Sequence, residues 1–293
     1  MNNSKERKFA GDYSIGVLSD EELVRLSSLF GLVWPNSKLT FDYISWLYRN
    51  NPLGFAQSFN VLDNGNIVGH YAAIPIEAEL FGVKAKGLLS LNSAVHPNYR
   101  GHGFFKNLAM RTFDSARKKG YRFVIGVANA NSTILFQRQL GFQIVRQLDV
   151  KIGIGEIFRS QNEENRHLDF KTCWSDSNLT WRLGRPGARY QWQKYPDLKK
   201  LLFDTGRFGI WGIVDGIPFD CCMTELSSHL KWNPVNIWIG LDPFCDWSKS
   251  LYVDLPQMLK PSPLNLIFKD LVEGERHLNS DRIRFSLLDF DAY

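Results

Sequence analysis

The order of apolar and polar positions predicts helices followed by strands at the start of the chain. Leu23, Leu26 and Phe30 recur at helical spacing after Asp20, which we expect to cap a helix over 21–30. A second helix, rich in aromatic residues, is expected over 41–48. The period then changes to that of strands, which are expected over 55–62, 67–76, 77–81 and 88–95, with a hairpin turn at 63–66.

The clearest helix is predicted over 104–119. Its apolar positions fall on one face, and Gly120 is a natural stop after two lysines. A buried strand is expected over 121–128, a short helix over 133–140 that stops at Gly141, and a pair of strands over 142–154. This order predicts a mixed sheet with helices on its faces.

The second part of the chain repeats the opening of the first in outline. Trp181 and Pro186 correspond to Trp46 and Pro52. The turn at 204–206 corresponds to that at 63–65, and 210–214 to 67–71; later strands are expected at 236–241, 264–268 and 282–289. Chance matches between aromatic residues would give the same outline.

A polar, charged stretch at 161–166 is the predicted linker. We therefore expect a first domain over 1–160 and a smaller second domain over 167–293.

Composition excludes several classes of protein. The net charge is +5, but the basic residues form no run of five or six, so we expect no nucleic-acid partner. The four cysteines form no CxxC pair and no metal-ligand spacing with histidine, so we expect no metal and a reduced, cytoplasmic protein. The first eight residues lack the apolar run of a secretory signal, and no apolar stretch of 18 residues predicts a membrane span.

The candidate chemistry lies in a loop between the strand over 88–95 and the long helix. The loop contains Arg100, Gly101, His102 and Gly103. Successive backbone N–H groups at a helix N-terminus bind anions, and the glycines allow close approach of a diphosphate. A plain tight turn would look the same. The spacing matches neither a Walker loop nor a dinucleotide-binding GxGxxG motif.

The wider pattern resembles the GNAT superfamily of acyl-CoA-dependent N-acetyltransferases. It comprises Val-His-Pro-Asn-Tyr-Arg-Gly-His-Gly over 95–103, the amphipathic helix, the buried strand, Asn131 and Leu140-Gly141-Phe142. Further residues resemble a subgroup associated with bacterial surface-polysaccharide biosynthesis: Trp46, Tyr48, Asn51, Pro52, Gly54, Trp181, Arg182, Pro186, Tyr190 and the stretch 289–291.

The resemblance implies an α/β (α+β) fold: a mixed, largely antiparallel GNAT-type sheet flanked by helices, then a smaller, degenerate GNAT-like domain without the phosphate loop. It implies acetyl-CoA as the acyl donor. The strand end at Ala94 and Val95 would pair with the pantetheine arm, and a backbone N–H near Val95 would polarise the thioester carbonyl. Asn131 matches a pantetheine contact or caps the helix over 133–140. Backbone groups would hold the pyrophosphate at Arg100, Gly101, His102, Gly103, Phe104 and Phe105.

The chain departs from the family where catalysis is concerned. Many members carry a tyrosine, acting as general acid, where this chain has Gln137. The strand over 88–95 has no carboxylate and offers only serines and Asn92. The remaining candidates for the general base are Glu77, Glu79, His70 and His96. A solvated strand face is the favoured interpretation of the two glutamates, and a structural loop position that of His96.

These features predict an N-acetyltransferase for a small-molecule amine, with an amino sugar or a nucleotide-linked amino sugar as the leading acceptor. The alternatives are a non-catalytic acyl-CoA-binding module and an acetyltransferase for protein or peptide amines. The oligomeric state stays open.

Overall fold

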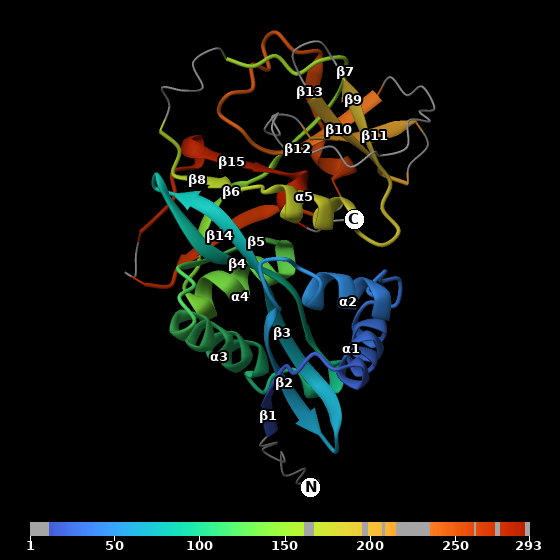
Figure 1. Ribbon diagram of the computed structural model, residues 1–293, viewed down its shortest axis with the longest axis vertical. Helices are drawn as coiled ribbons and strands as arrows, with labels where there is room; N and C mark the ends of the chain where they lie inside the picture. The colour runs from blue at the N-terminus through green and yellow to red at the C-terminus, as the bar shows by residue number, and fades with distance from the viewer. Residues whose placement is uncertain are drawn as a thin grey trace, which may run out of the picture.

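The computed structural model describes residues 12–160, 167–194, 199–206, 209–214, 235–260, 262–272 and 276–290. Fifteen strands in these residues belong to one hydrogen-bonded sheet. The N-terminal half forms the lower part of the molecule in Figure 1, and the C-terminal half the upper part. Within the described residues, no helix is long and apolar enough to cross a bilayer. The expected linker at 161–166 lies outside them.

The N-terminal half contains two helices near its start, α1 (Asp20–Val33) and α2 (Phe41–Arg49). The expected cap of the first helix is wrong by one position. Ser19 is the cap, and its hydroxyl accepts a hydrogen bond from the Glu22 N–H at 3.2 Å. Asp20 lies inside the first turn, where its negative charge suits the positive end of the helix dipole.

Four antiparallel strands lie side by side in the sheet: β1 (Asp12–Ile15), which precedes the helices, and β2 (Gln57–Asp63), β3 (Asn66–Leu80) and β4 (Val83–Val95), which follow them. The two strands expected at 67–76 and 77–81 form one continuous strand, β3, which ends at a turn where Phe81 and Gly82 have φ of +51° and +79°. β4 begins five residues earlier than expected. The next strand, β5 (Phe123–Ala128), is parallel to β4.

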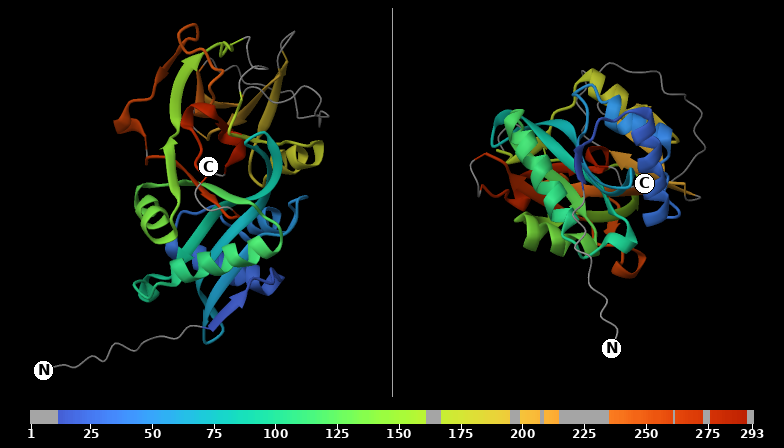
Figure 2. Two further views of the ribbon diagram at one scale, coloured as in Figure 1. Left: turned by 90° about the vertical axis from the view of Figure 1, so that its left-hand side faces the viewer. Right: turned by 90° about the horizontal axis from the view of Figure 1, so that it is seen from below.

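Helices cover both faces of this sheet (Figure 2). α3 (Phe104–Lys118) and α4 (Ala130–Leu140) pack on one face, where Tyr71 and Phe113 are buried. α1 and α2 pack on the other face, where Phe30 is buried. Side chains alternate along β3, so successive residues of this strand pack into two separate cores, one on each face of the sheet.

The second half repeats this order of elements. After α5 (Asp176–Leu183) come the antiparallel strands β9 (Tyr190–Lys194), β10 (Lys199–Asp204) and β11 (Ile210–Val214), and then β12 (Val235–Leu241), which is parallel to β11. β8 (Phe170–Thr172) and β15 (Ile283–Ser286) connect the two parts of the sheet. The short 3-10 helices are η1 (Pro97–Tyr99), η3 (Gln257–Leu259), η4 (Ser280–Arg282) and η5 (Leu287–Asp289).

The two halves exchange a strand. The expected pairing within 142–154 is wrong, because β6 (Gln143–Gln147) and β7 (Asp149–Ile154) go to different parts of the sheet. β7 lies between β12 and β13 (Tyr252–Asp254). In return, β14 (Asn265–Asp270) lies between β5 and β6. The pairing thus interleaves the expected domains, and their division at 161–166 stays a prediction.

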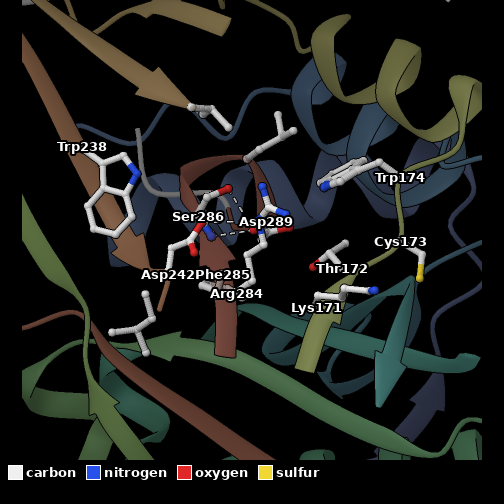
Figure 3. A pocket seen from close by; sticks show the side chains of 13 residues that line it. Lys171, Thr172, Cys173, Trp174, Trp238, Asp242, Arg284, Phe285, Ser286 and Asp289 are labelled. Carbon is white, nitrogen blue, oxygen red and sulfur yellow. Dashed lines mark hydrogen bonds and ion pairs between the residues drawn. The ribbon is translucent and has the colours of Figure 1, made fainter. Parts of the chain in front are cut away.

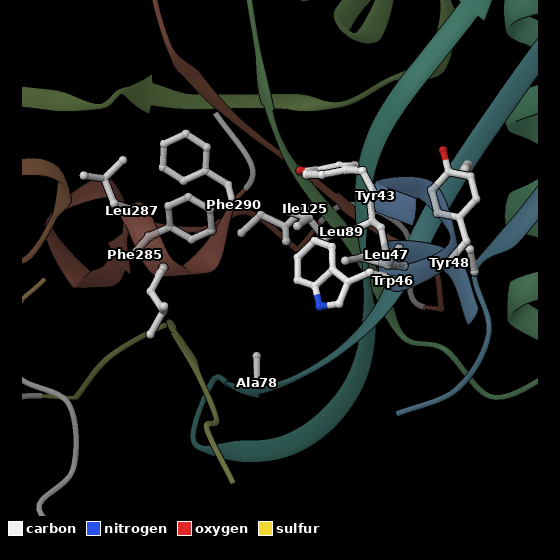
Figure 4. Close-up of a cluster of buried hydrophobic side chains, with 14 of the residues drawn as sticks. Tyr43, Trp46, Leu47, Tyr48, Ala78, Leu89, Ile125, Phe285, Leu287 and Phe290 are labelled. Atoms are coloured by element: carbon white, nitrogen blue, oxygen red, sulfur yellow. The ribbon is translucent and has the colours of Figure 1, made fainter. Parts of the chain in front are cut away.

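Reciprocal contacts join the halves. The rings of Trp46 and Trp181 stack with centroids 4.9 Å apart, and each indole N–H donates to the other residue's carbonyl oxygen, at 2.9 and 3.1 Å. Gln143 and Leu278 also exchange two hydrogen bonds, both of 2.8 Å. Such reciprocity is what a two-fold relation between similar units produces. Side chains of both halves share one core there, from Tyr43 to Phe290 (Figure 4).

Candidate functional site

A wedge between two parallel strands forms the candidate site. β4 and β5 pair from Gly87 opposite Phe123 to Ser90 opposite Gly126. Beyond that point the two described strands do not pair, although β4 continues to Val95. Backbone N–H and C=O groups on this edge of β4 can therefore accept an extended ligand as an added strand.

A bulge interrupts β4 at the wedge. Ala72 lies opposite Leu91 and His70 opposite Ala94, so two residues of β4, Asn92 and Ser93, face a single residue of β3. Asn92 has φ of +50°. A left-handed backbone at a residue other than glycine costs about 1–3 kcal/mol and is typical of functional sites. The bulge leaves part of the backbone outside the strand ladder.

The predicted phosphate loop lies at the end of β4 and opens α3. Gly101 and Gly103 have φ of +85° and +74°, which glycine adopts without strain. Gly103 is the N-cap of α3, no side chain caps the helix, and its first turn has no acidic residue. His102 and Arg100 are exposed in the same loop. The geometry suits an anion at the helix N-terminus.

Buried rings hold the loop in place. The Tyr99 hydroxyl donates to Asp63 at 2.5 Å, and this hydrogen bond raises the pKa of the phenol. Phe104 is buried, and the His102 ring stacks on it at 5.6 Å. The Phe105 ring meets Phe136 edge-on at 5.4 Å. Phe104 and Phe105 therefore face the core, and only their backbone groups are placed to meet a ligand.

Asn131 does not cap a helix, so that interpretation is wrong. α4 begins three residues earlier than expected, and Asn129 is its cap. The Asn129 side chain accepts from the Ser132 N–H at 2.9 Å, and the Ser132 hydroxyl accepts from the Asn129 N–H at 3.1 Å. Asn131 is exposed in the first turn beside the end of β5. Its contact with pantetheine stays a prediction.

The acidic candidates lie away from the wedge. Glu77 forms an ion pair with Lys84, and Glu79 with Lys171, each at 2.8 Å. Along β3, Glu77 lies five residues beyond Ala72, which is about 16 Å at the usual rise of a strand. These ion pairs favour the interpretation of both glutamates as a solvated strand face.

The histidine candidates have structural partners. The Nδ1 atom of His96 accepts from the Asn98 N–H at 3.2 Å and caps η1. His70 is buried under α1 and α2, and burial lowers its pKa to about 3, so the ring is neutral. His70 is therefore closed off from solvent, and the Nδ1 atom of His96 is occupied by the cap. Sequence reasoning named Tyr48 only for its resemblance to one subgroup. It did not predict that the buried hydroxyl contacts His70, because an aromatic residue in a helix predicts only a core position.

β11 is parallel to β12 as β4 is to β5, so 210–214 corresponds to β4 and the expected match with 67–71 is wrong. The second half closes the equivalent wedge with its own chain. β11 pairs with the first part of β12, and β15 then pairs with the rest, placing Ser286 opposite Gly240 and Phe285 opposite Leu241. A cavity of about 350 Å³ remains beside β15 and η5 (Figure 3). Asp289 borders it, its pKa is raised by burial, and it accepts from the Ser286 N–H at 2.6 Å. The chain itself therefore enters this wedge along β12, the counterpart of β5. A counterpart of the phosphate loop would fall within 215–234, outside the described residues.

Comparison with known proteins agrees with this geometry. Residues 15–145 match the family described as acetyltransferase (GNAT) domain. No curated protein matches the sequence. Three solved structures resemble 89% of the chain: a GCN5-related N-acetyltransferase from Kribbella flavida (TM-score 0.60, 10% identity, 71% of that chain), Eis1 from Mycobacterium abscessus (0.58, 12%, 74%) and a probable N-acyltransferase from Enterococcus faecalis V583 (0.55, 11%, 73%). At these identities the likeness shows a shared fold over both halves. Residues 15–145 of this chain are therefore similar to the acetyltransferase (GNAT) domain, and the solved structures share its fold.

Proposed function

We propose that the protein transfers an acetyl group from acetyl-CoA to the amine of a small molecule. The observation that carries the proposal is the open edge of β4, which leads directly into the uncapped N-terminus of α3. The pyrophosphate of CoA would lie against backbone N–H groups of 100–105, and the pantetheine arm would pair with Ala94 and Val95. Asn131 would contact the same arm from the other strand.

The reaction needs no covalent enzyme intermediate. The amine nitrogen attacks the thioester carbonyl carbon, so that a C–N bond forms and the C–S bond breaks. The sulfur leaves as a thiolate with the electron pair of the C–S bond. It takes up the proton that the nitrogen loses, and the product is free CoA thiol. A backbone N–H near Val95 would stabilise the oxyanion of the tetrahedral intermediate.

An amino sugar or nucleotide-linked amino sugar is the proposed acceptor, with a role in polysaccharide biosynthesis and a cytoplasmic location. This part rests on the resemblance of Trp46, Tyr48 and the second half to one subgroup of the superfamily. Trp181 stacks on Trp46 and so joins the two halves, whereas Arg182 donates to the carbonyl oxygens of Leu288 and Phe290 within the second half.

Calorimetric titration with acetyl-CoA tests the donor site. Gly103→Trp should abolish binding, because it fills the approach of the diphosphate. Gly120→Trp is the matched control: both glycines have positive φ, and both have open space where a Cβ would be added, but Gly120 lies at the far end of α3. Equal binding by parent, Gly103→Trp and Gly120→Trp would exclude the loop as the cofactor site.

Release of CoA thiol with a panel of amines tests the activity. Turnover with glucosamine and none with a lysine-containing peptide supports the proposed acceptor class. Turnover with the peptide alone would indicate a protein or peptide acetyltransferase. Binding of acetyl-CoA without turnover of any amine would indicate an acyl-CoA-binding module.

A further inference from the structure

A chain of buried hydrogen bonds runs from the surface to the bulge of β4. The Glu22 carboxylate accepts from the Asn60 side-chain amide at 2.6 Å. Asn60 Oδ1 is 2.7 Å from His70 Nδ1, and His70 Nε2 is 3.2 Å from the Tyr48 hydroxyl. These groups come from α1, β2, β3 and α2, so the fold assembles them from four elements.

The direction of each hydrogen bond in this chain is determined. Glu22 also accepts from the N–H groups of Val17 and Leu18, at 2.7 and 2.9 Å, which suits an ionised carboxylate. Asn60 therefore donates through nitrogen and presents its oxygen to His70. The neutral His70 ring has one N–H, which donates to Asn60 from Nδ1, and its Nε2 must accept the Tyr48 O–H.

The Tyr48 oxygen then has its lone pairs free to accept. Tyr48 is fully buried, and burial raises the pKa of its phenol far above the usual range, so the hydroxyl stays protonated. The Asn92 side chain opposes this rise, as an amide donor facing the phenol oxygen does. The Asn92 nitrogen is buried and makes no well-formed hydrogen bond within the described residues. An unsatisfied buried donor costs free energy, and an approach to Tyr48 would relieve it.

Asn92 lies at the bulge, beside the open edge of β4. If its buried nitrogen is satisfied by Tyr48, the oxygen of the planar amide lies on the side away from Tyr48. We propose that Asn92 Oδ1 accepts a hydrogen bond from the N–H of the acceptor amine, and that Tyr48, His70, Asn60 and Glu22 are positioning residues for it. This proposal rests on the proposed acetyltransfer and names the group that orients its nucleophile.

The chemical class of the acceptor follows from the amide. An amide oxygen orders an N–H group but takes no proton at ordinary pH, so the amine must reach the site uncharged. The proton that nitrogen loses after attack ends on the departing sulfur, directly or through water. The site therefore selects amines that are substantially neutral at the working pH, in contrast to an alkyl amine with a pKa near 10.4.

Kinetics with acetyl-CoA and three amines, glucosamine, glycinamide and butylamine, test the inference. The pH at which kcat/KM is half-maximal should follow the pKa of each amine, near 8 for an α-amine such as glycinamide and above 10 for butylamine. Asn92→Asp introduces a carboxylate, and aspartate tolerates the left-handed backbone at this position. Because a carboxylate can take a proton from the amine, this variant should lower the pH midpoint. A midpoint that is the same for all amines would show a titrating enzyme base and overturn the inference.

Variants test the positioning chain. Asn92→Gly keeps the positive φ and should lower kcat/KM for the amine about tenfold or more, and Tyr48→Phe about three- to tenfold, while the Kd of acetyl-CoA changes less than twofold. Tyr71→Phe is the matched control: its hydroxyl is equally buried and lies 2.7 Å from Ser90, on the opposite face of the sheet. It should change kcat/KM less than twofold.

The outcomes separate the two proposals. No binding of acetyl-CoA by the parent would refute the proposed function itself. Binding and turnover with no loss in Asn92→Gly, or an equal loss in Tyr71→Phe and Tyr48→Phe, would refute only the orienting role of Asn92.

Discussion

The strand exchange predicts that the N-terminal half does not fold when the chain ends at residue 160. Such a truncation removes β14, which lies between β5 and β6. Leu266, Ile267 and Phe268 of this strand are each no more than 1% exposed. Leu266 and Phe268 face the core under α1 and α2, whereas Ile267 faces the core under α3.

The loss can be estimated from burial. Full burial of an aliphatic or aromatic side chain contributes about 1.5–3 kcal/mol, so these three contribute roughly 5–9 kcal/mol. The total free energy of unfolding of a typical domain is about 5–15 kcal/mol. The truncation also leaves two interior strand edges without partners. We therefore expect no cooperative unfolding transition for residues 1–160, measured by circular dichroism during urea and thermal denaturation.

A chimera provides the control. The Leu148 N–H donates to the Leu264 carbonyl at 2.8 Å, and Gln147 lies opposite Asn265. An Asn-Gly turn can therefore join residue 148 directly to 264–272 as a hairpin. This chimera should regain a cooperative transition. The reasoning would be refuted if residues 1–160 alone unfolded cooperatively with the same midpoint as the chimera.

Two further predictions concern pH and helix α4. The folded pKa of His70 is about 3, below its unfolded value of about 6.5, so the unfolded state binds more protons between these values. Stability should fall by up to about 1.4 kcal/mol per pH unit below about 6.5, and His70→Gln should remove this part of the slope in urea titrations at pH 7, 6 and 5. Asn129→Ala should cost about 1 kcal/mol of stability through the lost cap, whereas Asn131→Ala should cost less than about 0.5 kcal/mol but weaken acetyl-CoA binding in calorimetry. Equal destabilisation by both alanine variants would contradict the assigned cap.

Local patterns in the sequence predicted the elements around the cofactor loop. The apolar face after Phe104 and the stop at Gly120 indicated α3 to within one residue. Gly101 and Gly103 were expected to allow an unusual backbone, and both have positive φ. These features depend on neighbours within a few residues, so the order of residue types is enough to indicate them.

Which strands pair with one another was decided by the tertiary structure alone. The apolar run at 264–268 predicted a strand, but nothing local showed that it pairs with β5, whose residues lie more than one hundred positions earlier. The bulge at Asn92 depends on how β3 and β4 align. The hydrogen bonds from Glu22 to Tyr48 depend on four elements meeting. Pairing between distant segments is determined by packing over the whole chain. The side-chain pattern of a strand shows which of its faces is buried, but it does not show which other strand lies beside it.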